Sequence, residues 1–203
     1  LGVPLIHLST DYVFDGSAVT PYRESDACAP ASAYGRSKAA GEQAVLAAYD
    51  DSTILRLAWV YSPFGVNFAR TMLRLAKDRD LVRVVADQYG APTSALDIAN
   101  GIIAVAKRLD ADRDAHLRGV FHMASQGTAT WAQFAAAVFE ESERLGGPSA
   151  GVEPIATSDY PTPAVRPANS RLDCSKLQAA YGVSLPYWRT RVGEVVARLL
   201  AES

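Results

Sequence analysis

The chain has 203 residues, of which 49% are hydrophobic and 21% are charged, which is typical of one globular domain with room for a smaller lobe. Its 20 basic and 22 acidic residues leave a formal net charge of -2, which argues against a nucleic-acid-binding protein. No apolar run reaches the roughly 18 residues that a membrane span needs. The two cysteines and three histidines lack metal-ligand spacing. These features predict a cytoplasmic protein without a metal site, a membrane contact or a nucleic-acid partner.

Strands and helices alternate along the sequence. The apolar run 5–8 predicts a short buried strand, and the β-branched and aromatic run 53–61 predicts a longer one. Further strands are expected over 82–86, 119–124 and 152–156, and helices over 32–49, 67–77, 94–109, 130–144, 175–181 and 186–201. Capping-box sequences at 94–97 and 130–133 mark two of the helix starts. This order predicts an α/β fold with a mainly parallel sheet, whose ligands bind beyond the carboxyl ends of the strands.

Tyr34 and Lys38 form a YxxxK pair in the first predicted helix. Positions i and i+4 share one helical face, so the ammonium can lie close to the phenol and favour its ionised form. Such a tyrosine can donate a proton to a carbonyl oxygen while a hydride reaches the carbon. By itself the pair is also compatible with a solvated helix face.

Five segments give this pair a context. They are STDYVFDG at 9–16, YGRSKAAGEQAV at 34–45, RLAWVYS at 56–62, DQYGAPTSALDIA at 87–99 and RPANSRLD at 166–173. Together they resemble the extended short-chain dehydrogenase/reductases, and among these the dTDP-4-dehydrorhamnose reductases. The resemblance implies part of a Rossmann-like parallel sheet with a smaller C-terminal substrate-binding lobe. It places the later part of the cofactor-binding domain in residues 1–130 and most of the substrate lobe in residues 131–203.

The resemblance also implies roles for individual residues. Tyr34 resembles the proton donor, Lys38 the residue that holds the nicotinamide ribose, and Thr10 the hydroxyl that binds the reacting carbonyl oxygen. The implied cofactor is NADPH, with NADH as the alternative, and Ser9 is a further cofactor contact. For the nucleotide-sugar substrate the implied contacts are Asp11, Tyr12, Trp59, Asn67, Phe68, Arg166, Asn169 and Ser170.

Two of these positions, and Asp173 in the last of the five segments, have alternative interpretations. Trp59 can be a core residue of its strand, and Arg166 can tie a loop by hydrogen bonds instead of binding a diphosphate. Asp173 is expected to cap the helix that follows it rather than to touch a ligand.

The sequence departs from the family at its front, because its 14 glycines include no Gly-rich turn of the kind that receives a dinucleotide pyrophosphate. We therefore expect the C-terminal portion of an enzyme that reduces dTDP-4-dehydro-L-rhamnose to dTDP-L-rhamnose, inactive alone. The exposed edge of the strand at 5–8 would then favour a homodimer or association with the missing N-terminal half. The alternative is a non-catalytic binding subunit that resembles the regulatory subunit of methionine adenosyltransferase.

Overall fold

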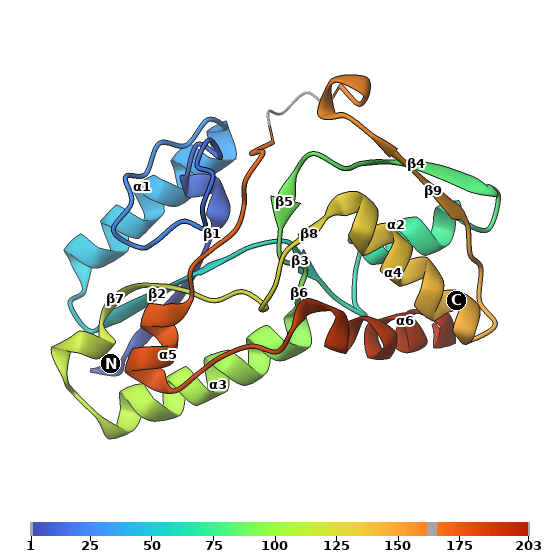
Figure 1. Cartoon of the computed structure of the whole chain (residues 1–203). Coiled ribbons are helices and arrows are strands. Elements are labelled where there is room, and N and C mark those ends of the chain that lie inside the picture. Colours follow the sequence, from blue (N-terminus) through green and yellow to red (C-terminus); the bar gives the residue numbers. More distant parts are fainter. Residues whose placement is uncertain (1, 162–165, 203) are drawn as a thin grey trace.

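The computed structural model describes residues 2–161 and 166–202, which form two groups of elements side by side (Figure 1). The first group is built on a parallel sheet in the order β1-β2-β7, with β1 (Leu5–Thr10), β2 (Ser52–Leu57) and β7 (Gly119–His122). Helix α1 (Ala33–Ala48) covers one face of this sheet, and α3 (Ala95–Ala111) and α5 (Ser175–Tyr181) cover the other. The parallel, helix-covered sheet that the alternation predicts is therefore present.

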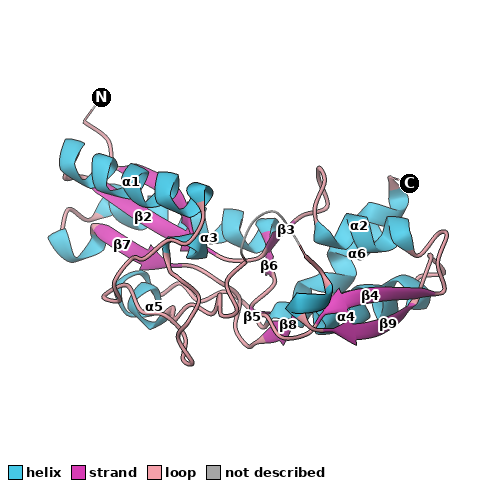
Figure 2. Cartoon of the chain, turned by 90° about the horizontal axis from the view of Figure 1, so that it is seen from above, coloured by secondary structure: helices cyan, strands magenta, loops and turns pink. Residues whose placement is uncertain are grey.

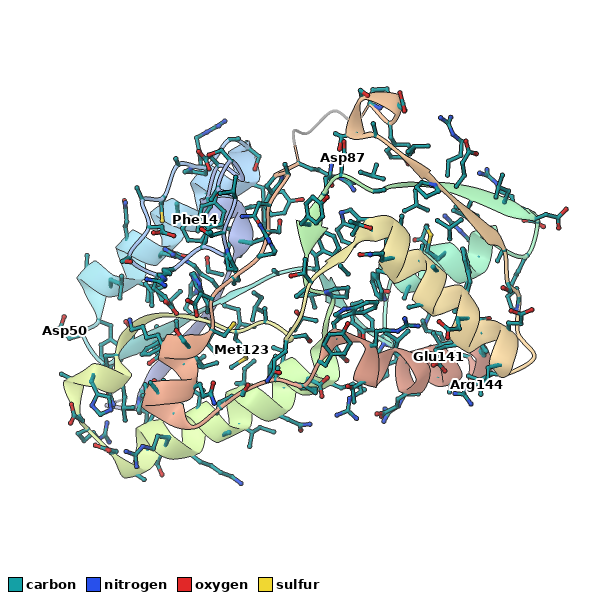
Figure 3. All side chains as sticks on the ribbon, viewed as in Figure 1. Phe14, Asp50, Asp87, Met123, Glu141 and Arg144 are labelled. Carbon is teal, nitrogen blue, oxygen red and sulfur yellow. The ribbon has the colours of Figure 1, made fainter. Side chains whose placement is uncertain are left out.

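Side chains of β2 alternate between these two faces. Leu55 and Leu57 point into a core that they share with α3, β7 and α5, in which Met123 also lies (Figure 3). Arg56 points to the opposite face, where its guanidinium meets Glu42 of α1. One strand thus fixes helices on both sides of the sheet.

The second group packs around a parallel strand pair of β4 (Leu81–Val85) and β9 (Gly151–Ile155). Helices α2 (Phe68–Leu75), α4 (Trp131–Arg144) and α6 (Val192–Ala201) surround one apolar cluster with this pair. Two-residue strand pairs lie between the groups (Figure 2): β3 (Val60–Tyr61) with β6 (Thr93–Ser94), and β5 (Tyr89–Gly90) with β8 (Ala129–Thr130). Short 3-10 turns cover Asp11–Val13, Ala115–Leu117, Thr157–Asp159 and Trp188–Arg191.

The two apolar clusters are assembled from interleaved parts of the sequence. The cluster of the second group takes residues from before position 90 as well as from α4 and α6. The chain therefore passes between the groups several times, and the division at residue 130 stays a prediction. None of the helices in the described ranges is long and apolar enough to cross a membrane.

Two helix starts agree with the local sequence signals. Ser32 caps α1, with its hydroxyl accepting from the Gly35 amide at 3.0 Å. At α4 the predicted capping box is complete, since Thr130 Oγ1 accepts from the Gln133 amide and Gln133 Oε1 accepts from the Thr130 amide. These bonds satisfy amide groups that the helix itself leaves unpaired.

The predicted capping box at Ser94 is wrong in its second half. Ser94 Oγ does cap α3, accepting from the Leu96 amide at 3.3 Å. The Asp97 carboxylate instead pairs with Arg191 at 2.7 Å, which links α3 to the start of α6. The predicted helix over 186–201 accordingly begins as a 3-10 turn, and its α-helical part starts only at Val192.

The long predicted strand over 53–61 is interrupted. β2 ends at Leu57 and β3 begins at Val60, because Trp59 adopts a left-handed φ of 47° that no extended strand allows. The helix expected over 67–77 is shorter, spanning Phe68–Leu75 with Asn67 as its N-cap. β1 is the edge strand of its sheet in the described chain, and its Leu5 and Leu8 are 42% and 40% exposed, so it is only partly buried. Self-association through this edge stays a prediction.

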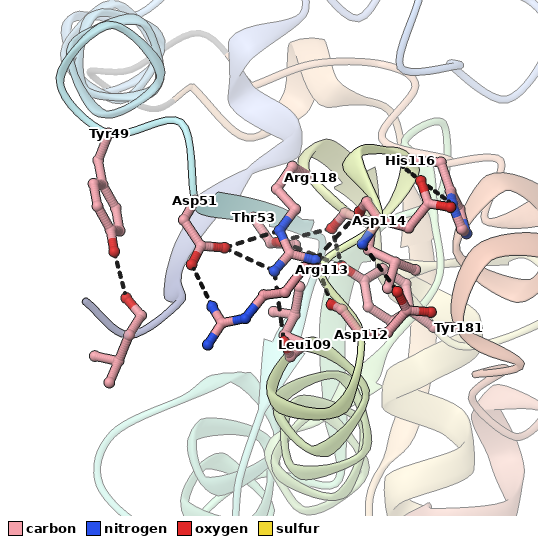
Figure 4. Close-up of polar contacts among 12 residues, drawn as sticks. Tyr49, Asp51, Thr53, Leu109, Asp112, Arg113, Asp114, His116, Arg118 and Tyr181 are labelled. Atoms are coloured by element: carbon pink, nitrogen blue, oxygen red, sulfur yellow. Dashed lines mark hydrogen bonds and ion pairs between the residues drawn. The ribbon is translucent and has the colours of Figure 1, made fainter.

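An ionic cluster closes the amino end of the sheet (Figure 4). Asp51, just before β2, accepts from Arg113 at 2.9 Å and from Arg118 at 2.9 Å, and both arginines lie between α3 and β7. Nearby, the Tyr49 hydroxyl at the end of α1 donates to the Val3 carbonyl. These contacts tie the ends of the sheet elements together far from the carboxyl ends of the strands.

Candidate active site

A cleft of about 580 Å³ opens at the carboxyl ends of β1 and β2. This is where a parallel sheet presents its ligand site. Its lining comes from β1 and the turn after it, from α1, from the break between β2 and β3, and from the start of α4. The lining residues are Leu8, Ser9, Thr10, Asp11, Tyr12, Tyr34, Lys38, Leu57, Trp59, Val60 and Trp131.

The turn after β1 forms one wall of the cleft. Thr10 Oγ1 accepts from the Tyr12 amide at 3.2 Å and donates to Asp11 Oδ1 at 2.9 Å. A threonine hydroxyl has a single proton, and in this arrangement that proton is used in the hydrogen bond to Asp11. Thr10 can donate to a ligand oxygen only when the bond to Asp11 is reversed or broken.

Asp11 is suited to such a reversal. Its side chain is buried, and burial raises its pKa to about 6, although the Ser170 and Thr10 hydroxyls lower it in part. A protonated Asp11 can donate to Thr10 and release the threonine proton towards the cleft. Burial also raises the pKa of the neighbouring Tyr12, with the Asp11 charge acting in the same direction and the Arg166 charge opposing it.

Tyr34 and Lys38 enter the cleft from the first turns of α1. Tyr34 is 56% exposed, and its ring packs against the Tyr12 ring in a T-shaped arrangement, with 5.7 Å between centroids and 74° between planes. Lys38 Nζ donates to the Leu8 carbonyl at 2.7 Å, which places the ammonium at the end of β1. The predicted Thr10, Tyr34 and Lys38 set is therefore gathered in one cleft.

Gly35 explains how α1 comes so close to this turn. A Cβ at Gly35 would lie 2.1 Å from the Tyr12 carbonyl oxygen and 2.9 Å from Pro30 Cβ. Only glycine permits this approach of the two backbones. The first turn of α1 thereby brings the Tyr34 side chain beside the Thr10–Tyr12 turn.

A pair of stacked tryptophans forms the opposite wall. The rings of Trp59 and Trp131 lie 3.6 Å apart between centroids, at 10° between planes. Both line the cleft, so Trp59 is not simply a core residue of its strand. Trp131, the first residue of α4, was not among the predicted site residues, because its only sequence signal was membership of the capping box.

The other predicted residues lie at varying distances from the cleft. A hydrogen bond from Ser170 lowers the pKa of Asp11, and the charge of the exposed Arg166 lowers the pKa of Tyr12. Both residues therefore lie near the lining of the cleft. Phe68 packs against Trp131, with 4.7 Å between ring centroids. Asp173 is not the N-cap of α5, which is Cys174, but its Oδ1 accepts from the Ser175 amide at 2.9 Å at the start of that helix.

Asn67 and Asn169 are outside the lining. Asn67 caps α2 and donates to the Ser62 carbonyl at 2.8 Å. Asn169 is buried, donating to the Ala18 and Thr20 carbonyls and accepting from Arg171. Because both amides are engaged in holding loops, their predicted contacts with substrate stay predictions.

The polar groups of the cleft are of kinds that can bind hydroxyl groups and transfer a proton. An exposed phenol, an ammonium with two protons left over from its bond to Leu8, and a threonine hydroxyl meet at one strand end. These groups can bind ribose hydroxyls and supply a proton to a carbonyl oxygen.

Comparison with known proteins agrees with this chemistry. The RmlD substrate binding domain family matches residues 1–201. The dTDP-4-dehydrorhamnose reductase of Sinorhizobium fredii is 50% identical over 202 residues, which are 100% of this chain and 68% of that protein. The chain belongs to the dTDP-4-dehydrorhamnose reductase family.

Solved structures of the family have the same fold. The dTDP-4-dehydrorhamnose reductase of Clostridium acetobutylicum gives a TM-score of 0.87 at 36% identity, covering 100% of this chain and 67% of that one. The enzyme from Bacillus anthracis, solved in complex with NADP, gives 0.85 at 33% identity, covering 100% and 66%. The Rossmann-like fold and the family predicted from the motifs are thus confirmed, and the chain spans about two thirds of the length of these relatives.

Proposed function

We propose that the protein reduces the keto group of dTDP-4-dehydro-L-rhamnose to give dTDP-L-rhamnose, with NADPH as cofactor. The observation that supports this most strongly is the convergence of Thr10, Tyr34 and Lys38 on one cleft at the carboxyl end of β1. A protein that only bound a ligand would have no use for a proton donor and an ammonium on one face of α1.

In this proposal NADPH supplies the hydride when it is bound. Lys38, which already reaches the end of β1 through Leu8, binds the ribose hydroxyls and keeps a positive charge near the phenol. Tyr34 Oη transfers its proton to the keto oxygen as that oxygen gains charge. Thr10 holds the same oxygen in place by a hydrogen bond.

The Thr10–Asp11 bond then has a chemical consequence. With Asp11 ionised, the Thr10 proton is held by the carboxylate, and the hydroxyl offers the keto oxygen only a lone pair. With Asp11 protonated, the bond can run from Asp11 to Thr10, and Thr10 can donate to the substrate. Protonated Asp11 is therefore the form that favours the reaction.

The sugar would lie between this turn and the tryptophan wall. The part of the Trp59 ring that lines the cleft would give the deoxyhexose ring an apolar surface. Arg166, whose charge lowers the pKa of Tyr12, would attract the anionic diphosphate. These substrate contacts rest on the family resemblance together with the positions of the side chains.

The test is NADPH consumption by the protein, expressed with any residues that precede Leu1 in its gene, when dTDP-4-dehydro-L-rhamnose is added. We expect stoichiometric conversion to dTDP-L-rhamnose, identified by mass spectrometry. dTDP-glucose, which lacks the keto group, should give no consumption. Binding of the keto sugar without turnover would reject the reductase proposal and favour the non-catalytic alternative.

A further inference from the structure

The stacked tryptophans are held by a chain of hydrogen bonds that starts outside the cleft. Trp131 Nε1 donates to Gln88 Oε1 at 3.2 Å. Gln88 Nε2 donates to Thr157 Oγ1 at 3.0 Å, and Thr157 Oγ1 donates to Asp87 Oδ1 at 2.6 Å. Gln88 itself is only 4% exposed and does not line the cleft.

Strand register explains why Gln88 meets Trp131. β5 and β8 are antiparallel, with Tyr89 opposite Thr130 and Gly90 opposite Ala129 (Figure 1). The next pair outward along this register is Gln88 and Trp131, one residue before β5 and one after β8. The first residue of α4 is thus brought next to a buried glutamine by two short strands.

The donor and the acceptor of each hydrogen bond from Trp131 to Asp87 follow from the chemistry of the groups. The Asp87 carboxylate accepts from both the amide and the hydroxyl of Thr157. Because the Thr157 proton is used on Asp87, its oxygen can only accept from Gln88, which must present Nε2. Gln88 Oε1 is then left facing the Trp131 indole N–H, which is a donor only.

Trp59 depends on Trp131 in turn. Its left-handed φ of 47° is unusual for a bulky residue and persists only where the surroundings hold it. Its carbonyl accepts from the Thr93 amide at 3.0 Å. Its ring stacks on Trp131 and also lies close to Gly90, where a Cβ would approach Trp59 Cε2 to 2.4 Å. Gln88, which lies outside the cleft, therefore positions the cleft wall through its hydrogen bond with Trp131.

We propose that Gln88 is a positioning residue that holds the Trp59–Trp131 pair as a rigid wall against the sugar ring of the substrate. This inference rests on the proposed function for the identity of the ligand. The hydrogen bonds also connect the wall to Asp87 and to Thr157 in the 3-10 turn Thr157–Asp159 (Figure 3).

Loss of Gln88 acts on binding rather than on the proton transfer. Without the acceptor, the half-buried indole N–H of Trp131 is left unpaired, and the ring turns away to reach water. Trp59 then loses its stacking partner, while Thr10, Tyr34 and Lys38 keep their own contacts. We expect the KM for the keto sugar to rise about 10-fold, with kcat changed less than about 3-fold.

Gln88→Leu is the main test, read by KM and kcat and by circular dichroism, because stacked indoles give an exciton couplet that separated ones do not. The matched control is Gln126→Leu, which removes another glutamine-to-hydroxyl bond, to Ser184, at an exposed position away from the cleft. We expect Gln88→Leu to diminish the couplet and raise KM, and Gln126→Leu to change neither. A folded Gln88→Leu protein with the wild-type couplet and KM would overturn the proposal.

A second pair of variants keeps the test decisive. In a Trp131→Phe background, which has no indole N–H, Gln88→Leu should raise KM no further, and an additive effect would overturn the proposal. If Gln88→Leu does not fold, Thr157→Val at an exposed position removes the acceptor of Gln88 Nε2 and should also weaken the couplet, whereas an unchanged couplet would overturn it. Absence of reductase activity would contradict only the proposed function. The circular dichroism couplet would still test the role of Gln88, because it reports on the tryptophan pair without any substrate.

Discussion

Glu42 of α1 and Arg56 of β2 form an ion pair of 2.6 Å in which the two side chains are only 5% and 4% exposed. Both Nε and Nη2 of Arg56 donate to the carboxylate. Glu42 lies one helical turn beyond Lys38, so this pair fixes the helix that carries Tyr34 and Lys38 to the central strand of the sheet.

Removing one partner of this pair should be costly. Glu42→Ala leaves the Arg56 charge buried and unpaired, and we expect the free energy of unfolding to fall by about 3–5 kcal/mol in urea titrations. The control is Glu202→Ala, which breaks the partly exposed Arg70–Glu202 pair and should cost about 0–1 kcal/mol. Equal losses from the two variants would show that the buried pair does not hold α1.

Local sequence signals predicted the parts of the fold that local bonds decide. The caps at Ser32 and Thr130 act within four residues, so the starts of α1 and α4 follow from the sequence. Asp97 looked like a local cap but binds Arg191, 94 positions away, which no short window reveals. The break at Trp59 likewise follows from tertiary contacts, because its carbonyl pairs with Thr93 and its ring stacks on Trp131.

The candidate site was predicted to a similar extent and for similar reasons. Thr10, Tyr34, Lys38 and Trp59 lie in recognisable motifs, and all four line the cleft. Trp131 and Gln88 could not be predicted, because they meet only through the β5–β8 register. Asn169 lies in a motif as well, yet its amide is taken up by loop carbonyls.

The close contact between Gly90 and Trp59 gives a steric prediction. A methyl group at Gly90 would overlap the Trp59 ring, so Gly90→Ala should destabilise the protein by about 1–3 kcal/mol and weaken sugar binding. Gly41 in α1 has open space around its Cβ position, and Gly41→Ala should stabilise by about 0.5–1 kcal/mol. Thermal unfolding compares the two, and a neutral Gly90→Ala would mean that the ring moves aside freely.

Asp11 predicts a stability that changes with pH in an unusual direction. Its pKa is raised from 3.8 to about 6 by burial, so ionisation is less favourable in the folded protein and stability falls as pH rises through this interval. Asp11→Asn should therefore be more stable than wild type by about 3 kcal/mol above pH 7, with the gap closing towards pH 4.

Asp15→Asn is the control of opposite sign. The Ser17 amide lowers the pKa of this exposed carboxyl, so its contribution is present at neutral pH and lost on acidification. Urea titrations of both variants at several pH values compare them. A gap for Asp11→Asn that does not change with pH would contradict the buried-carboxyl account.

His122 should dominate the response to acid. Burial, with the Arg56 charge second, lowers its pKa from 6.5 to about 3, so its contribution to stability is complete above pH 6.5 and declines as pH falls towards 3. His122→Gln should remove about 3 kcal/mol of the wild-type loss between pH 6.5 and about pH 4. Urea titrations of wild type and His122→Gln at several pH values compare the two slopes, and an unchanged slope in His122→Gln would reject this role for His122.

The most direct test of the account is the turnover of Tyr34→Phe against that of Tyr49→Phe, each expressed with any residues that precede Leu1 in its gene. Both tyrosines belong to α1 or its end, but Tyr49 only donates to the Val3 carbonyl, far from the cleft (Figure 4). We predict that Tyr34→Phe lowers NADPH-dependent reduction of the keto sugar by about 10²–10⁴-fold while sugar-nucleotide affinity stays the same. Tyr49→Phe should turn over at the wild-type rate. Wild-type turnover by Tyr34→Phe across the pH range would contradict the central claim, because the proton would then come from another group.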